Sequence, residues 1–219
     1  MKKHFYFALL VMLFVFLLPG AAGSSDELRA NGELKSYQGV ALGSAYDFRE
    51  NSIKGVPTVD LKKYRLKIDG LVKRPLSYTY DQLKAFPHQK KLVTVHCVEG
   101  WNVSVLWEGI PFSEFAGRTG VEPKADTVIF HSADGYTTSL ALKTVAGKNM
   151  LLADFANGIP LPARLCFPFI LVAEDKWGYK WARWIERIEF SAKTSYRGYW
   201  EQRGYNNRGD FPGPEFEEQ

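Results

Sequence analysis

Short segments that alternate apolar and polar residues, each closed by a turn signal, follow one another along most of this chain. Residues 64–69 and 184–190 alternate in this way, as half-buried strands do, and Asp134-Gly135 and Asn157-Gly158 are tight-turn dipeptides. Helical patterns are few and short, and strands do not alternate with helices. This argues against a doubly wound parallel sheet, and the pattern predicts an α+β domain that is mainly β.

The expected elements can be placed by residue range. Strands are expected at 64–69, 76–80, 90–96, 103–107, 126–132, 136–142, 150–157, 167–173 and 184–190. Short helices are expected at 80–86, 111–119 and 142–148. The chain has no internal repeat.

Size and composition indicate one packed domain with appendages. The chain has 219 residues, of which 46% are hydrophobic and 15% aromatic, so it can fill a core. Its net charge is +4 and its basic residues are interleaved with acidic ones, which gives no nucleic-acid-binding stripe.

The N-terminus has the three-part pattern of a secretory signal. Lys2 and Lys3 precede the apolar run 5–18, and a small-residue stretch follows, with cleavage expected after Gly23. The run is shorter than the roughly 20 residues of a spanning helix, although an uncleaved anchor is the alternative. We therefore expect an exported, periplasmic or extracytoplasmic protein with a signal at 1–23, a lead-in at 24–45, one domain at 46–205 and a flexible tail at 206–219.

Cys97 stands where the strand expected at 90–96 ends in a Gly-containing turn. A thiol in that position can face a cavity as a soft ligand or a nucleophile, although a small buried apolar residue is the simpler interpretation. The other cysteine is Cys166, and in an exported chain the two could form a disulfide. His96 adjoins Cys97, but neighbours in a strand point to opposite faces, which argues against a Cys–His nucleophile.

Two segments rich in hydrogen-bond donors accompany the thiol. One surrounds Arg49, Asn51 and Lys54, and the other spans 176–183. Cations and backbone amides in such loops suit a phosphate, and a thiolate suits a transition metal, although ordinary surface loops have the same composition. The common nucleotide-binding glycine loops and the Cys-x-x-Cys-His motif of covalent haem are both absent from the sequence.

An ordered set of motifs resembles the sulfite-oxidase-type molybdopterin oxidoreductases, in particular small bacterial proteins made of the molybdenum-binding domain alone. The motifs that carry the resemblance are Asp47-Phe-Arg-Glu-Asn-Ser-Ile-Lys-Gly55, Tyr64-Arg-Leu-Lys-Ile-Asp-Gly-Leu71, Cys97-Val-Glu-Gly-Trp101, Trp107-x-Gly-x-Pro111, His131-x-x-Asp-Gly-Tyr-Thr-Thr-Ser-Leu140, Asn157-Gly-x-Pro-Leu-Pro162, Phe167-Pro168, Lys176-Trp-Gly-Tyr-Lys180 and Gly198-Tyr-Trp200.

The resemblance implies a fold, a cofactor and a set of site residues. The fold would be the mixed, mainly β sulfite-oxidase domain. The cofactor would be molybdenum held by one pyranopterin in its mononucleotide form, with no haem in this chain. Cys97 would be the thiolate ligand of the metal, and Tyr136 would lie on its substrate side. The residues expected to contact the cofactor are Arg49, Asn51, Ser52, Lys180 and Arg183.

The resemblance also implies an activity. We expect oxygen-atom transfer on a small oxyanion or an S- or N-oxide, with electrons exchanged with a separate cytochrome or membrane haem protein. The alternative is a cofactor-free extracytoplasmic binding protein that keeps the fold.

Three positions depart from the resemblance. Ile170 stands where many relatives carry a polar residue, often Arg, and cannot donate to an anion. Cys166 replaces a usual Gly, and a disulfide with Cys97 would abolish the metal ligand, so we expect none. Lys2-Lys3 stands where export of a folded cofactor protein normally uses twin arginines.

Overall fold

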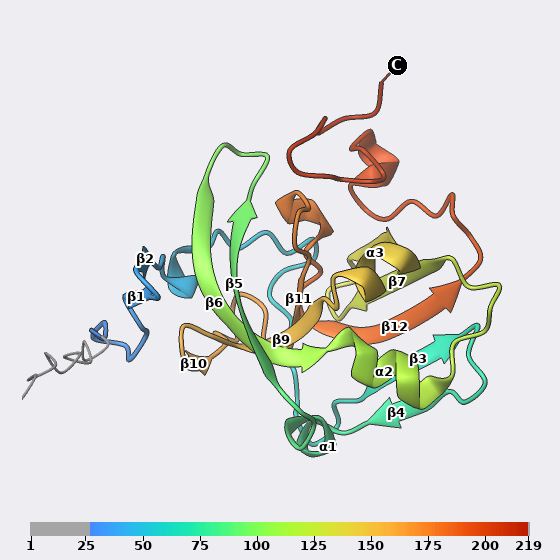
Figure 1. Cartoon of the computed structure of the whole chain (residues 1–219), viewed down its shortest axis with the longest axis horizontal. Coiled ribbons are helices and arrows are strands. Elements are labelled where there is room, and N and C mark those ends of the chain that lie inside the picture. Colours follow the sequence, from blue (N-terminus) through green and yellow to red (C-terminus); the bar gives the residue numbers. More distant parts are fainter. Residues whose placement is uncertain (1–26, 219) are drawn as a thin grey trace, which may run out of the picture.

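The computed structural model describes residues 27–218, and two five-stranded sheets form its framework (Figure 1). The first sheet has the order β10-β9-β6-β5, with β11 also paired to β9. Its strands are β5 (Gln89–His96), β6 (Asn102–Pro111), β9 (Leu151–Ala156), β10 (Ile159–Pro160) and β11 (Ile170–Val172). The second sheet has the order β4-β3-β12-β7-β8. Its strands are β3 (Leu66–Gly70), β4 (Leu76–Tyr78), β7 (Thr127–Ser132), β8 (Thr137–Ala141) and β12 (Ile185–Ser191).

The remaining elements are small. A two-stranded ribbon joins β1 (Ser36–Tyr37) to β2 (Val40–Ala41). The α-helices are α1 (Tyr80–Lys84), α2 (Phe112–Thr119) and α3 (Leu142–Gly147). Single 3₁₀ turns lie at Ala45–Asp47, Gly178–Lys180 and Glu201–Arg203.

Strand pairing is antiparallel except between β12 and β3, which run parallel. Large apolar side chains from both sheets, including Trp107, Ile110, Phe130 and Ile188, are almost completely buried in one shared core. The sequence-based prediction of a mainly β fold with mixed sheets and short helices is therefore confirmed.

One strand is shorter than the sequence predicted. A strand was expected over 167–173, but only β11 is paired, at Ile170–Val172. Pro168 has no backbone N–H to donate to a ladder, so the apolar run begins as irregular chain. The two-residue strands β1, β2 and β10 are too short to show the alternation of apolar and polar residues by which a strand is predicted from sequence.

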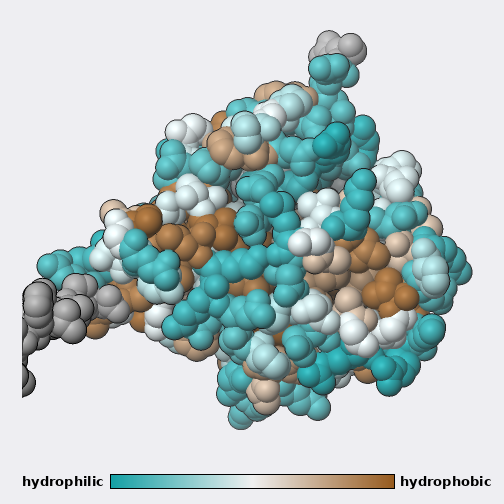
Figure 2. Space-filling model, viewed as in Figure 1, coloured by the Kyte–Doolittle hydropathy of each residue, from teal (hydrophilic) through white to brown (hydrophobic). Residues whose placement is uncertain are grey.

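The N-terminal segment lies against β6. The Gly43 N–H donates to the Ser104 carbonyl at 2.9 Å. Figure 2 shows hydrophobic surface gathered on the left of the view, where this segment meets β6. Within residues 27–218, no helix is long and apolar enough to cross a membrane. The expected signal at 1–23 lies outside the described residues.

The C-terminal segment, 201–218, differs from the flexible tail expected from residue 206. The Phe211 ring stacks on His96 with 3.7 Å between ring centroids, and Trp177 Nε1 donates to the Gly213 carbonyl at 3.1 Å. Asp210 pairs with Lys176, whose side chain is 7% exposed. A composition rich in Gly, Pro and acid reads as loose chain because these long-range partners leave no local signal.

Candidate active site

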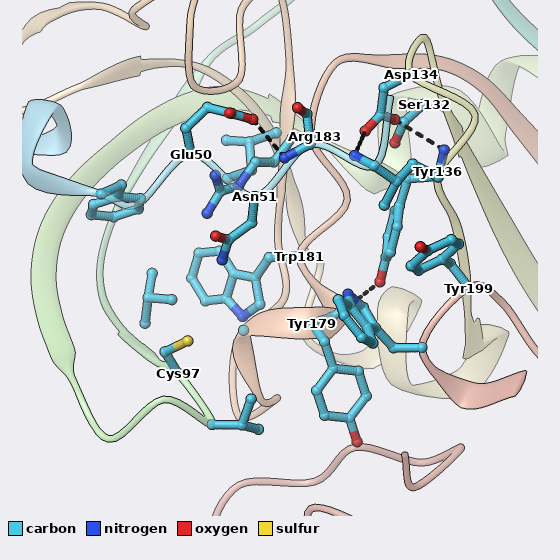
Figure 3. A pocket seen from close by; sticks show the side chains of 18 of the residues that line it. Glu50, Asn51, Cys97, Ser132, Asp134, Tyr136, Tyr179, Trp181, Arg183 and Tyr199 are labelled. Carbon is cyan, nitrogen blue, oxygen red and sulfur yellow. Dashed lines mark hydrogen bonds between the residues drawn. The ribbon is translucent and has the colours of Figure 1, made fainter. Parts of the chain in front are cut away.

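A cavity of about 510 Å³ opens between the two sheets, beside the end of β5 (Figure 3). Five segments that are distant in the sequence form its wall. They are the irregular stretch 48–53, the end of β5 with its following turn at 95–101, the β7–β8 turn at 132–136, the 178–184 loop and residues 199–205, and Ile170 of β11 adds one further side chain.

Cys97 lies on this wall, directly after β5, as the sequence predicted. The turn is closed by hydrogen bonds from Cys97 N to Trp101 O at 2.9 Å and from Gly100 N to Cys97 O at 3.0 Å. The residue is 8% exposed, and burial raises the pKa of its thiol, although the charge of Arg183 acts in the opposite direction. Its Sγ is 3.8 Å from Glu99 Oε2, so the thiol points to the polar mouth of the turn rather than into the core.

Asn51, Ser52 and Arg183, which the resemblance implies contact the cofactor, also line the cavity. Arg183 Nη1 donates to the Arg49 carbonyl at 2.9 Å, which joins the 178–184 loop to the 48–53 stretch. Arg49 itself is not on the wall. Its side chain is 67% exposed and pairs with Glu99 at 3.4 Å, so it lies at the rim.

The β7–β8 turn brings Tyr136 to the opposite side. Asp134 accepts hydrogen bonds from the backbone N–H groups of Tyr136 at 2.9 Å and Ile53 at 3.0 Å, which fixes the turn against the 48–53 stretch. The Tyr136 hydroxyl donates to the Tyr179 carbonyl. The ring is partly exposed, but its hydroxyl is desolvated, and this burial raises the pKa well above the ordinary value, so the group stays neutral.

Aromatic side chains from the chain's last part complete the wall. Tyr199, Trp200 and Tyr205 line the cavity. Gly198 makes this possible, because a Cβ at that position would lie 2.1 Å from the Thr137 carbonyl oxygen. The backbone can therefore approach β8 closely and place the following aromatics beside Tyr136.

Lys180 does not line the cavity, contrary to the expectation that it contacts the cofactor. It is completely buried behind the wall, and its Nζ donates to Glu201 Oε1 at 2.5 Å and to the Asn207 carbonyl at 2.9 Å. Spacing within the 176–183 loop could not reveal this, because the partners come from the C-terminal segment.

Some lining residues were missed as site residues. Ser132 and Asp134 are within the His131–Leu140 motif, but Asp134-Gly135 was read only as a turn signal. Glu99 is within the Cys97–Trp101 motif, where it also accepts from Trp101 Nε1 at 2.9 Å. The motifs thus contained these residues, but only the tertiary structure shows which residues of each motif face the cavity.

Comparison with known proteins identifies the class. The family model described as the oxidoreductase molybdopterin binding domain matches residues 53–200. The chain therefore belongs to this family and is an oxidoreductase of the sulfite-oxidase type, as the motif set predicted.

Individual relatives support the same class. The chain is 36% identical to the uncharacterized oxidoreductase YuiH of Bacillus subtilis (strain 168) over 152 residues, which cover 69% of this chain and 76% of that protein. It is also 36% identical to the putative protein-methionine-sulfoxide reductase subunit YedZ1 of Azospira oryzae, covering 69% of this chain. The match to the protein-methionine-sulfoxide reductase catalytic subunit MsrP of Xanthomonas axonopodis pv. citri is 27%, covering 78% of this chain. In both sulfoxide-reductase relatives the chain covers 57% of the relative's length.

A solved structure has the same fold. The sulfane dehydrogenase SoxCD of Paracoccus pantotrophus matches with a TM-score of 0.60 and 25% identity, over 64% of this chain and 41% of that one.

The cavity residues fit the molybdenum cofactor that the family implies. Cys97 supplies a soft ligand at the wall, and Arg183 supplies a cation suited to a phosphate. The buried Ser132 Oγ has no hydrogen-bond partner within the described chain, so a polar group bound in the cavity would satisfy it. Among residues 27–218 no group of three or more His, Cys, Asp or Glu side chains is arranged to hold a metal.

Proposed function

We propose that this protein is a mononuclear molybdenum enzyme that reduces S-oxides, with Cys97 as the protein ligand of the metal. The observation that carries the proposal is the position of Cys97. Its thiol lies on the wall of a cavity large enough for an organic cofactor, opposite Tyr136, and Arg183 lines the same cavity. The printed names of two relatives, a sulfoxide reductase subunit and a sulfoxide reductase catalytic subunit, point to the same chemistry.

The charge of the cavity favours a neutral S-oxide over an oxyanion. Glu50, Glu99 and Asp134 face it, and Arg183 is the one cation among the lining residues of the described chain. Ile170 is also on the wall, where it offers no donor. A bound cofactor phosphate adds negative charge, so a free oxyanion would meet net repulsion.

Each lining group has a task in this proposal. The bound cofactor supplies the two-electron chemistry that accepts the oxygen atom. Overall, the S–O bond breaks, two protons and two electrons enter, and a thioether and water leave. Arg183, Asn51 and Ser52 hold the organic part of the cofactor. Tyr136 presents a neutral hydroxyl, whose proton can turn from the Tyr179 carbonyl to the oxygen of the substrate.

The aromatic wall suits the same substrate. Thioether sulfur packs favourably against aromatic rings, and Tyr199, Trp200 and Tyr205 lie on the side of the cavity next to Tyr136. We propose that these rings contact the two apolar groups bonded to the sulfur of the S-oxide.

The electrons require a separate redox protein, and we propose a cytochrome or membrane haem protein in this role. The words "subunit" and "catalytic subunit" in the names of the relatives support such an assembly. The pattern of residues 1–23 supports export to the periplasm or another extracytoplasmic compartment.

Metal analysis with a matched pair of cysteine variants tests the ligand. The full chain is produced in a host that makes molybdopterin, and molybdenum is measured per protein. We expect a one-to-one ratio for the native chain and for Cys166→Ser, and loss of the metal or of turnover for Cys97→Ser with its fold retained. A native protein that carries no molybdenum would refute the proposal.

Substrate class is tested on the same preparation. With a chemically reduced dye as electron donor, methionine sulfoxide should be reduced, and sulfite should not be oxidised when an electron acceptor replaces the donor. Faster sulfite oxidation than sulfoxide reduction would contradict the charge argument while leaving the ligand assignment of Cys97 intact.

A further inference from the structure

A buried ion pair lies immediately behind the Tyr136 side of the cavity. The side chains of Lys180 and Glu201 are both 0% exposed, and Lys180 Nζ lies 2.5 Å from Glu201 Oε1. Burial lowers the pKa of Lys180, against the opposing effect of Glu201. A buried pair is often no more stabilising than a well-packed apolar pair, so its presence calls for a reason other than stability.

The pair is connected to Tyr136 in two ways. Thr138 Oγ1 donates to Glu201 Oε1 at 2.5 Å, and the Thr138 side chain lies close enough to the Tyr136 hydroxyl to affect its pKa, although no hydrogen bond joins the two within the described chain. Lys180 is the last residue of the turn Gly178–Lys180, and the carbonyl of its neighbour Tyr179 accepts from the Tyr136 hydroxyl. Moving either charge would therefore disturb a neighbour of that hydroxyl.

Glu201 has a further property that sets it apart from an ordinary core group. Its Oε2 is buried and has no hydrogen-bond partner within the described chain, while Oε1 accepts from both Lys180 and Thr138. Both side-chain hydrogen bonds to the Glu201 carboxylate therefore come from Lys180 and Thr138, the two residues that connect it to the surroundings of Tyr136.

The acid of this pair comes from outside the matched family domain. The family match ends at residue 200, and Glu201 follows directly. Asn207, whose carbonyl also holds Lys180, and Asn206, whose carbonyl accepts from the Tyr179 hydroxyl at 2.8 Å, come from the same segment. Gly209 lets this segment pass close to Lys180, since a Cβ there would lie 2.6 Å from Lys180 Cγ.

We propose that Lys180 and Glu201 are positioning residues that fix the Tyr136 hydroxyl at the cavity, so that the C-terminal segment completes the active site from behind. The pair does not touch the substrate. It holds in place the Tyr179 carbonyl, which accepts from the Tyr136 hydroxyl, and the neighbouring Thr138 side chain. This role rests on the proposed function only for its effect on turnover, because the position of Tyr136 can be observed without any reaction.

The test uses variants that remove the pair without leaving a lone buried charge. Lys180→Met with Glu201→Leu replaces both charges by apolar groups of similar size, which buried pairs commonly tolerate. The full chain is labelled with 3-fluorotyrosine, and the Tyr136 fluorine resonance is assigned from its absence in Tyr136→Phe. We expect one sharp resonance in the native protein and a shifted or broadened one in the double variant.

Turnover of methionine sulfoxide supplies the second measurement. In the double variant, kcat should fall about 10- to 100-fold, the size of loss that a displaced reacting group causes, with KM little changed. In the Tyr136→Phe background the same two substitutions should have little further effect, because they act through the tyrosine.

Asp210→Asn is the matched control. It also removes one negative charge from the C-terminal segment, at the pair with Lys176, but within the described chain it forms no hydrogen bond or ion pair with Lys180 or Glu201. It should leave the resonance and kcat unchanged. An unchanged Tyr136 resonance in the double variant, or an equal change in Asp210→Asn, would overturn the proposal. A shifted resonance in a native protein that reduces no sulfoxide under any condition would instead count against the proposed function alone.

Discussion

The two segments that flank the matched domain are both anchored by a buried glutamate, but in different ways. At the N-terminal side, every hydrogen bond to Glu33 in the described chain comes from an uncharged donor, with Ala45 N at 2.8 Å and Asn157 Nδ2 at 3.3 Å on one oxygen and Ser44 Oγ at 2.5 Å on the other. The partly exposed Arg29 lies farther away, with its Nε 3.8 Å from Oε2. At the C-terminal side, Glu201 is held by a buried lysine. The first anchor joins the segment to the turn after β9, whereas the second lies beside the cavity.

The two anchors differ in whether the segment they attach also contributes to the cavity. The hydrogen bonds to Glu33 attach residues 27–45, none of which lines the cavity. The charged pair at Glu201 belongs to a segment that supplies Tyr205 to the wall and supports the turn that holds Tyr136. We therefore expect damage to the first anchor to change stability alone, and damage to the second to change stability and turnover together.

The largest effect is expected when only one charge of the C-terminal anchor is removed. Glu201→Leu leaves Lys180 buried without its partner and should lower the free energy of unfolding by about 3–5 kcal/mol. Urea unfolding measures this loss. The double variant with Lys180→Met should recover most of it, and a double variant as unstable as the single one would show that packing, not the unpaired charge, sets the cost.

Glu33→Ala should have the next largest effect and should leave turnover unchanged. The substitution strands buried donors of Ser44, Ala45 and Asn157, which costs about 1–3 kcal/mol. Hydrogen exchange should show the loss concentrated in residues 27–45. A fall in kcat would contradict the separation of the two segments.

Acid should loosen the same segment. Burial opposes ionisation of Glu33, but hydrogen bonds from Ser44, Asn31, Ala45 and Asn157 outweigh it and lower the pKa below the ordinary value of 4.5. The stabilisation is present above that ordinary value and is lost as pH falls through the lower, folded-state pKa.

Hydrogen exchange of residues 27–45, followed as pH is lowered from 4.5, checks this expectation. Glu33→Gln removes the titrating group and should make exchange of the segment less dependent on pH. Equal pH dependence in the native chain and in this variant would assign the effect to other carboxylates.

The smallest effect is expected at an exposed ion pair on the C-terminal segment. Arg197 and Glu217 lie 3.3 Å apart with side chains 46% and 36% exposed. Glu217→Gln keeps an acceptor for the Asn207 N–H and removes only the charge, so the free energy of unfolding should change by about 0–1 kcal/mol. A larger loss, measured by the same urea titration, would mean that solvent screens this pair less than its exposure implies.

The sequence predicted what local pattern can encode. The strand before Cys97 and the turn that carries Tyr136 are visible as alternation and turn signals, and both lead to the cavity as expected. The family motifs then predicted the fold, because their order along the chain reflects the order of the strands.

Other parts depend on contacts that have no local signature. Lys180 meets Glu201 and Asn207, which are 21 and 27 residues away and lie in a stretch that composition marks as loose. Arg49 contributes its carbonyl rather than its guanidinium to the Arg183 contact, and composition cannot separate the two. The positions of Lys180 and Arg49 relative to the cavity therefore depend on tertiary contacts that the sequence pattern does not encode.

The two free cysteines allow metal-free molecules in a preparation to be counted by alkylation of their thiols. Cys166 is 2% exposed and does not line the cavity. Burial raises the pKa of its thiol to about 12, so alkylating reagents should not react with it in the native state. Cys97 faces the cavity, where a small reagent can enter. Under the proposed ligand role, the number of thiols alkylated in the native state would report directly how many molecules in a preparation lack their metal.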